Sequence, residues 1–261
     1  MSTPRQSRVL QMLAPSMGVH QSIKRNAGVS FRREDSGSTK AYRVATGRGS
    51  DDFDRFGLMS RDQRMTPNAE YLESFREALA TSGILDGCLT DRILQMSKVT
   101  RASKHTKIIH AGHVPHHCYF IVRGLARYFY QASNGKEWNK AFFRENEWAG
   151  SLNSYLTGEA CAFSIDVLEN SILISIPLAL FKPLDDVHPE LRTLVQHKIQ
   201  EIMLRNEQRE GMLLTLNSES RYAWICHHQR WLLERVAQYH LASYLGIEPQ
   251  SLSRLKRSVS L

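Results

Sequence analysis

Between residues 100 and 177, hydrophobic and polar positions change over short stretches and do not recur with a helical period. Six stretches are rich in aromatic and β-branched residues and are separated by glycine or asparagine. They are 107–110, 118–122, 125–130, 139–143, 163–168 and 171–176. Short strands at near-regular spacing are typical of an antiparallel β-barrel or sandwich. Asn134-Gly135 is the strongest hairpin signal, and Gly158-Glu159 is interpreted as another hairpin turn.

Helices are predicted before the strands, between residues 71 and 98. Tyr71, Phe75 and Leu79 fall on one helical face. Ser82-Gly83 interrupts this pattern, and Thr90 is the predicted N-cap of a second short helix.

After the strands, residues 188–216 have the pattern of one long helix. Positions of a coiled-coil seam recur at spacings of four and three. The predicted seam consists of Val195, Ile199, Ile202, Asn206, Arg209, Leu213 and Leu216. A parallel dimer is favoured because a second copy would bury so long a helix most completely, with Asn206 and Arg209 as a polar centre. The alternative is a single amphipathic helix packed on its own barrel.

The C-terminal stretch 235–257 predicts two short helices joined by a tight turn, after a helix that restarts at Ser218. Gly246 stands where the first helix must end, because glycine takes the left-handed conformation without a Cβ clash. Pro249 is tolerated in the first turn of the next helix. The polar residues left outward are Gln250, Ser251, Ser253, Arg254, Lys256 and Arg257. Such a set suits a helix that reads the major groove of DNA. The alternative is a packing unit with a solvated basic face.

Charge divides the chain unevenly. Residues 1–66 hold twelve Lys and Arg against six Asp and Glu, which gives +6 of the formal net charge of +8. Apolar residues are sparse there, so burial cannot offset the entropy of ordering, and disorder is predicted. The segment is a basic arm for DNA, a tail without function, or an over-extended start. The predicted organisation is this extension, a barrel sensor domain with N-terminal helices (67–187), a dimerisation helix (188–217) and a helix–turn–helix domain (218–261).

Cysteine spacing and hydropathy exclude several classes. Cys88, Cys118, Cys161 and Cys226 are far apart, and no pair is separated by two residues, which argues against a zinc finger. Scattered cysteines in a chain of 261 residues favour reduced thiols and a cytoplasmic location. No apolar run is long enough for a membrane span, and no secretory signal opens the chain.

The order of a barrel, a long helix and a C-terminal helix–turn–helix resembles the Crp/Fnr family of bacterial transcription regulators. The motifs that carry the resemblance are Tyr119-Phe120-Ile121-Val122-Arg123-Gly124-Leu125-Ala126-Arg127, Ser220-Arg221-Tyr222, His240-Leu241-Ala242-Ser243-Tyr244-Leu245-Gly246-Ile247 and Ser251-Leu252-Ser253-Arg254. The resemblance implies an α+β fold with a small antiparallel jelly-roll barrel similar to a cyclic-nucleotide-binding domain. It also implies a homodimer that binds double-stranded DNA, and it leaves room for RNA polymerase and an unknown small-molecule effector as partners.

The resemblance also assigns positions in the second helix of the pair. Pro249 falls on the first base-contacting position, where it cannot hydrogen-bond a base. Gln250 and Arg254 match the next two, for adenine and guanine. Ser251, Ser253, Lys256 and Arg257 would contact phosphate. Because only 258–261 follow Arg257, little or no β-wing is expected, either because it is absent or because the chain is truncated.

The expected phosphate-binding segment departs from the family pattern. Gly150 is not followed by an acid, and no Arg or Lys occurs between Arg144 and Lys182, although a cyclic phosphate needs a cation. We therefore expect no useful affinity for cyclic AMP. Gly150, Ser151, Asn153 and Ser164 are the candidate effector-pocket residues. No cysteine occurs in the first 87 residues, which disfavours an iron–sulfur cluster.

Two other functions compete with this one. His110, His113, His116 and His117 suggest a metal-dependent barrel enzyme similar to a cupin. Their spacing does not place them on one strand face, so solvated loop histidines are favoured, with neither a metal site nor catalytic residues predicted. No nucleophile elbow, P-loop or dinucleotide fingerprint occurs. The remaining alternative is a regulator that has lost operator binding and acts through protein contacts.

Overall fold

The structure is a computed structural model that describes residues 67–83 and 85–259. The predicted extension 1–66 lies outside these residues. No helix in the described ranges is long and apolar enough to cross a lipid bilayer. The fold class is α+β, with two antiparallel sheets, and helices come both before and after the strands in the sequence.

Within the described residues, two helices precede the sheets, as predicted. They are α2 (Pro67–Thr81) and α3 (Gly87–Met96), and Phe75 and Ile93 are fully buried. The predicted cap at Thr90 is wrong. Asp86 is the N-cap of α3, because its carboxylate accepts the Leu89 N–H at 2.7 Å. Thr90 lies inside the helix and donates to the Asp86 carbonyl.

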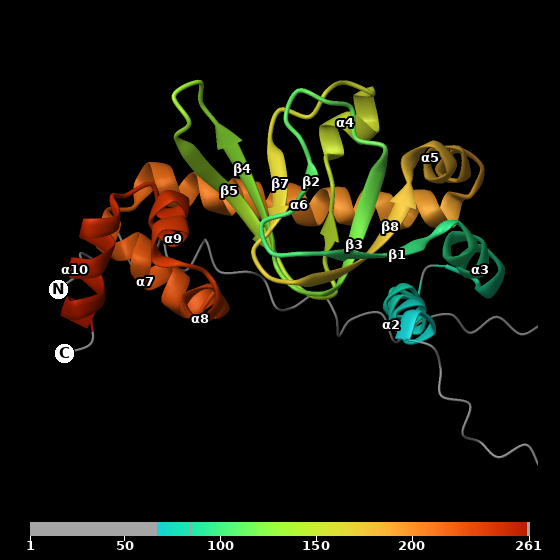
Figure 1. Cartoon of the computed structure of the whole chain (residues 1–261), viewed down its shortest axis with the longest axis horizontal. Coiled ribbons are helices and arrows are strands. Elements are labelled where there is room, and N and C mark those ends of the chain that lie inside the picture. The colour runs from blue at the N-terminus through green and yellow to red at the C-terminus, as the bar shows by residue number, and fades with distance from the viewer. Residues whose placement is uncertain (1–66, 84, 260–261) are drawn as a thin grey trace, which may run out of the picture. The chain divides into compact units, whose positions relative to one another are not determined.

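The strands form a jelly-roll barrel of two four-stranded antiparallel sheets, in the orders β1-β8-β3-β6 and β2-β7-β4-β5 (Figure 1). The strands are β1 (Lys98–Ala102), β2 (Lys107–Ile109), β3 (His117–Arg123), β4 (Ala126–Gln131), β5 (Glu137–Phe143), β6 (Trp148–Ala149), β7 (Ser164–Val167) and β8 (Ser171–Pro177). The predicted hairpin at Asn134-Gly135 joins β4 to β5, and the Ala132 N–H donates to the Lys136 carbonyl at 2.9 Å.

A β-bulge interrupts the pairing of β4 with β5. Tyr128 pairs with Ala141, whereas the next residue, Phe129, pairs with Asn139. Lys140 is therefore the extra residue. A bulge shifts the alternation of side chains between the two faces of a strand. In β5 it places the side chains of Asn139 and Ala141 on opposite faces, although a regular strand would place them on the same face.

A short helix, α4 (Leu152–Thr157), lies where the sequence predicted a hairpin turn at Gly158-Glu159. That prediction is wrong. Gly158 ends α4 with φ of 77°, and Ser151 begins it as an N-cap that accepts the Ser154 N–H. A glycine in the left-handed region serves both kinds of turn, so the sequence signal was ambiguous.

Two helices follow the barrel. The first, α5 (Leu178–Val187), was not predicted, and the second, α6 (Pro189–Thr215), matches the predicted long helix. Figure 1 shows α6 running along the barrel from α5 toward α7. Side chains of α6 contact the barrel, since Arg205 pairs with Glu147 at 2.5 Å and Lys140 donates to Asn206 at 3.4 Å.

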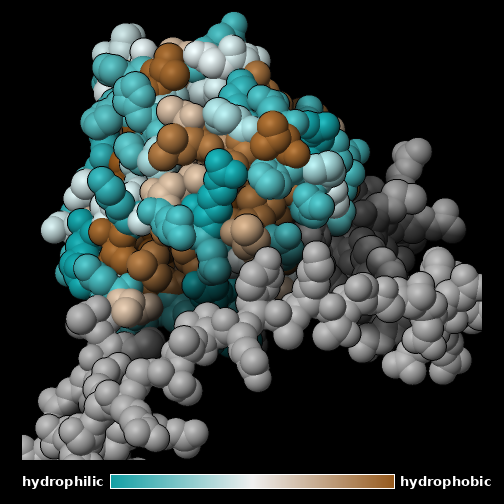
Figure 2. Space-filling model, turned by 90° about the vertical axis from the view of Figure 1, so that its right-hand side faces the viewer, coloured by the Kyte–Doolittle hydropathy of each residue, from teal (hydrophilic) through white to brown (hydrophobic). Residues whose placement is uncertain are grey.

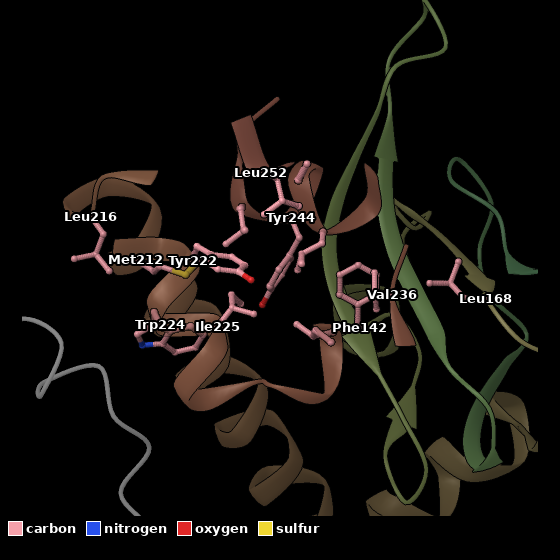
Figure 3. Close-up of a cluster of buried hydrophobic side chains, with 14 of the residues drawn as sticks. Phe142, Leu168, Met212, Leu216, Tyr222, Trp224, Ile225, Val236, Tyr244 and Leu252 are labelled. Atoms are coloured by element: carbon pink, nitrogen blue, oxygen red, sulfur yellow. The ribbon is translucent and has the colours of Figure 1, made fainter. Parts of the chain in front are cut away.

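The C-terminal helices are α7 (Ser218–His228), α8 (Trp231–Arg235), α9 (Gln238–Leu245) and α10 (Pro249–Val259). The helix predicted to restart at Ser218 is capped by Asn217 and is divided into α7 and α8. Gly246 has φ of 67° and ends α9, as predicted. Tyr244 lies between Tyr222 of α7 and Phe142 of β5 (Figure 3), and its ring meets that of Phe142 edge-on at 5.3 Å.

Hydrophobic side chains also reach the surface. On the face shown in Figure 2 they gather in patches separated by hydrophilic residues. Among the described residues, the most exposed large hydrophobic side chains are Leu214 (76%), Val187 (68%) and Met203 (63%). Two of these, Met203 and Leu214, lie on α6.

Candidate functional sites

The α9–turn–α10 pair presents one polar helix face to solvent. Leu252 of α10 is fully buried against Leu241 and Leu245 of α9, which fixes the orientation of α10. Of the six predicted DNA contacts, Gln250, Ser253, Arg254 and Arg257 are exposed, and Ser251 and Lys256 are half-buried. The structure therefore places all six on or beside the outer face of one helix.

The predicted seam on α6 divides into two parts. Val195, Ile199 and Ile202 are half-buried along the barrel side, and Asn206 is exposed. The C-terminal part of the prediction needs correction. Leu216 is 4% exposed and belongs to the chain's own core beneath α7, against which Leu213 also packs. In the last turn of α6, residues that pack in the chain's own core have the same spacing as residues of a coiled-coil seam. Periodicity alone could therefore not distinguish the two roles.

Arg209 also differs from its predicted role as a seam residue. Its guanidinium donates to the backbone carbonyls of Asn139 and Tyr244 at 3.0 and 3.1 Å, and it lies over the Tyr244 ring. It therefore connects α6 to both β5 and α9 within one chain.

A cavity of about 520 Å³ lies between the barrel, α4 and α6. Three of the four predicted effector-pocket residues line it, namely Gly150, Ser151 and Asn153. Ser164 does not, because it is buried and its hydroxyl accepts the Ala111 N–H at 3.1 Å. Most of the lining is apolar or aromatic, and the volume falls in the range of small-molecule sites.

The α9 helix is held on the barrel by a buried polar cluster that the sequence analysis missed. Arg127 of β4 donates to both carboxylate oxygens of Asp166 of β7, at 2.9 and 2.5 Å, and to Glu137 at 2.7 Å. The side chains of Arg127 and Asp166 are each 5% exposed. The signal was present, because Arg127 and Asp166 each stand inside a predicted hydrophobic strand, and a buried charge requires a partner.

His240 of α9 completes this cluster. Arg127 Nη1 donates to His240 Nδ1 at 3.1 Å. Arginine cannot accept, so Nδ1 is unprotonated and the neutral ring carries its proton on Nε2. Burial, and then the charge of Arg127, lower the pKa of His240 to about 4. The ring is therefore neutral at pH 7.

The open edge of β5 is satisfied by α9. β5 is the last strand of its sheet, so its outer backbone groups have no neighbouring strand. The Asn139 N–H donates to Ser243 Oγ at 3.0 Å, and this hydroxyl donates to the Glu137 carbonyl at 3.2 Å. The Asn139 side chain donates to the His240 carbonyl at 2.7 Å. We call these contacts, with the Arg127 cluster, the docking face.

A second ionic contact joins α8 to the barrel loops. Arg235 bonds to both Glu145 and Glu169, with four distances between 2.7 and 3.0 Å. Burial alone would raise the pKa of Glu145, but hydrogen bonds from Arg235 and from the Gly124 N–H outweigh it and lower this pKa to about 2.

The barrel histidines do not converge. His110, His113 and His116 are exposed, and His117 is half-buried at the start of β3. The described residues contain no group of three or more His, Cys, Asp or Glu placed to hold a metal ion. Burial raises the pKa of the Cys118 thiol to about 12, so this cavity-lining cysteine is a weak nucleophile.

Comparison with known proteins agrees with this geometry. Residues 99–186 match the cyclic nucleotide-binding domain family. Similar solved structures include FixK2 from Bradyrhizobium japonicum, with a TM-score of 0.55, 14% identity, and coverage of 63% of this chain and 84% of that one. The c-di-GMP-responsive regulator CLP from Xanthomonas campestris has a TM-score of 0.57 and 15% identity, covering 67% and 92%. A putative Crp/Fnr-family regulator from Eubacterium rectale has a TM-score of 0.58 and 11% identity, covering 70% and 88%.

No curated protein sequence matches this chain. At these identities the solved structures establish the fold alone. The described chain is thus a jelly-roll barrel joined by a long helix to a C-terminal helical domain. Its barrel matches the cyclic nucleotide-binding domain family, and its fold is similar to the folds of these solved structures.

Proposed function

We propose that this protein is a sequence-specific DNA-binding transcription regulator that acts as a homodimer in the bacterial cytoplasm. The observation that carries the proposal is the α9–turn–α10 pair, whose second helix is fixed by Leu252 and presents Gln250 and Arg254 to solvent. A helix presented in this way fits the major groove of B-DNA. RNA polymerase is a further partner in this proposal.

The residues of α10 take different roles in this proposal. Arg254 reads guanine, since its fork matches the two acceptors of a guanine edge, and Gln250 reads adenine. Ser251, Ser253, Lys256 and Arg257 hold phosphate, which positions the helix but carries no sequence information. Pro249, at the start of the helix, makes no hydrogen bond to a base.

The homodimer forms along α6 in this proposal. Ile199, Ile202 and Asn206 lie beside the barrel, and Met203 and Leu214 are exposed by 63% and 76%. Met203 and Leu214 each follow a predicted seam residue, Ile202 and Leu213, by one position, so the exposed apolar stripe is rotated from the seam predicted by the sequence. A second copy of α6 would cover these side chains, and two-fold symmetry would match a palindromic operator.

The barrel senses a small molecule in this proposal, and the protein is not an enzyme. The cavity beside α6 supports a ligand site. A cyclic nucleotide is not the proposed ligand, because no Arg or Lys occurs from residue 145 to residue 181 to hold its phosphate at α4. Neither an iron–sulfur cluster nor another cofactor is part of the proposal.

Sequence-specific DNA binding can be tested by capturing genomic DNA fragments with the full-length protein at two salt concentrations. The expected result is enrichment of fragments that share a two-fold symmetric motif, with affinity that falls steeply as salt rises. Arg254→Ala should lose about 1–3 kcal/mol of binding free energy and relax specificity at one base pair, whereas Lys256→Ala should weaken all sequences alike.

Lys104→Ala is the matched control, because Lys104 is an exposed cation on the barrel and its removal changes the net charge equally. Its effect should be small at every sequence. Salt-sensitive binding without an enriched motif would contradict sequence-specific regulation. A uniform loss for Arg254→Ala across operators would contradict its assignment to a base.

A further inference from the structure

The cavity between the barrel and α6 has an apolar body. Its lining includes aromatic rings from both sheets, from the residue before β7 and from α5, namely Tyr128, Phe143, Trp148, Phe163 and Phe181. Tyr128 and Phe163 stack at 5.3 Å with an interplanar angle of 23°. Such a lining favours a ligand whose larger part is apolar, since most of its surface must leave water.

The positively charged side chains on the cavity wall differ in whether a carboxylate pairs with them. Three cations line it, and two of these are paired: Lys198 with Glu201 at 2.9 Å and Arg205 with Glu147 at 2.5 Å. The third, Lys140, donates only to the Asn206 amide oxygen, at a long 3.4 Å. Within the described part of the chain, no carboxylate pairs with Lys140.

The position of Lys140 follows from the bulge in β5. As the extra residue of that bulge, it lies at the point where the strand changes face. Its ammonium is 5.7 Å from the centre of the Phe163 ring, which also lines the cavity. Burial, and then the charge of Arg209, lower the pKa of Lys140. An anion at this point would relieve both effects.

Arg209 supplies a second observation at the same end of the cavity. A smaller hollow shares Lys140, Arg205 and Asn206 with the main cavity and is lined also by Arg209. Arg209 Nε is buried and has no hydrogen-bond partner among the described residues. A buried donor without an acceptor is costly, so this corner has more donors than acceptors.

We propose that the cavity binds a carboxylic acid with an apolar body, whose carboxylate is held by Lys140 at the Arg209 end and whose body packs among the aromatic rings. In calling this acid the effector, we rest on the regulator function proposed above. The carboxylate would lie next to Asn139, whose backbone contacts α9 and Arg209. Ligand binding would therefore act directly on the strand that holds the C-terminal helices.

The test is isothermal titration calorimetry on the full-length protein with matched acid and neutral probes. The pairs are naphthaleneacetate with naphthaleneacetamide, for an aromatic body, and decanoate with decan-1-ol, for an aliphatic one. In at least one pair the acid should bind about tenfold more tightly than its neutral partner, and the preferred pair identifies the body. Cyclic AMP is the third kind of probe and should bind more weakly than the preferred acid.

Lys140→Met should remove the preference for the acid while leaving the neutral partner's affinity unchanged. Lys140→Gln serves if the first variant fails to fold. The matched control is Lys136→Met, because Lys136 is exposed in the β4–β5 turn and does not line the cavity. It should retain the preference in full.

Equal affinity for acid and neutral probes, an unchanged preference in the folded Lys140 variants, or no binding by any probe would each overturn the proposal. Tighter binding of cyclic AMP than of either acid would also overturn it. The capture of genomic DNA is measured separately, without probes. Acid binding without DNA enrichment would count against the regulator function alone, and DNA enrichment without acid binding would count against the ligand class alone.

Discussion

The two faces of the sheet β2-β7-β4-β5 have opposite chemistry. The docking face carries Arg127, Asp166 and Asn139, and its buried charges are paired and hydrogen-bonded. The cavity face carries Tyr128 and Phe143 and borders about 520 Å³ of space. The first face is closed and specific for α9, whereas the second is open and apolar. One sheet can therefore hold the C-terminal helices and also contact a ligand.

The largest expected effect on this comparison is the loss of a buried charge partner on the docking face. Arg127→Met leaves Asp166 charged and buried, and we expect a loss of about 3–5 kcal/mol in the free energy of unfolding. Urea denaturation measures it. The double variant Arg127→Met, Asp166→Leu should recover much of the loss, because no fully buried charge remains unpaired and the third partner, Glu137, is one-third exposed to water. A double variant as unstable as the single one would show that the pair does not act as a unit.

The next effect is an acid-dependent loosening of the docking face at His240. Its pKa is about 4 in the fold against an ordinary 6.5. The unfolded chain therefore binds more protons between these values, and stability should fall as pH decreases from about 6.5 to about 4, by about 2–3 kcal/mol in total. Protonation would place a hydrogen on Nδ1 facing the Arg127 guanidinium, with Glu137 and His105 as the other charged or titratable neighbours.

His240→Asn is the informative variant, since the amide oxygen can accept from Arg127 without titrating. The free energy of unfolding, measured by urea denaturation at a series of pH values, should lose its slope in this window. Glu145 contributes at lower pH. Its carboxylate stabilises the fold above about 4.5 and loses that effect as pH falls toward 2. A slope between pH 6.5 and 4 that survives in His240→Asn would assign it to another group.

A smaller effect is expected at the hydroxyl that satisfies the edge of β5. Ser243→Ala removes the acceptor of the Asn139 N–H and the donor to the Glu137 carbonyl. We expect a loss of about 1 kcal/mol in the free energy of unfolding. Ser253→Ala, the same substitution on the exposed face of α10, should change it by less than about 0.5 kcal/mol. Equal effects of the two variants would mean that water replaces Ser243.

The smallest effect is expected on the cavity face. Lys140→Met should leave the free energy of unfolding within about 0.5 kcal/mol of the original or raise it slightly, because it removes a partly desolvated and unpaired cation. Denaturation in the absence of ligand measures this. A loss above about 1 kcal/mol would show that Lys140 is structural, and would weaken the contrast between the faces.

The sequence was sufficient for features that depend on neighbouring residues. Short aromatic and β-branched stretches between glycine or asparagine residues predicted the longer strands, Asn134-Gly135 predicted the hairpin, and Gly246 predicted the end of α9. It was insufficient for β6, which has two residues, and for α4, because such short segments have no measurable period. Periodicity also did not locate the division between α5 and α6.

Of the candidate sites, the sequence predicted the exposed face of α10 but not the docking face. The positions on α10 follow from helical spacing, so their exposed face was accessible to sequence reasoning. The docking face depends on contacts between residues far apart in sequence, since Arg127 is 39 residues from Asp166 and 113 from His240. A local pattern shows that a buried charge needs a partner but does not identify the partner.

The bulge at Lys140 has a consequence for how β5 should be aligned with other chains. Asn139 and Phe142 both face the C-terminal helices. Their positions differ by three, which in a regular strand would place their side chains on opposite faces. Ala141 and Phe143 face the cavity. Deleting Lys140 would remove the bulge and restore regular alternation, so that both sets of side chains would stay on their present faces. A related chain that lacks the inserted residue should therefore show the same order of inward and outward side chains on either side of a gap at Lys140, and an alignment without that gap would compare the inside of one barrel with the outside of another.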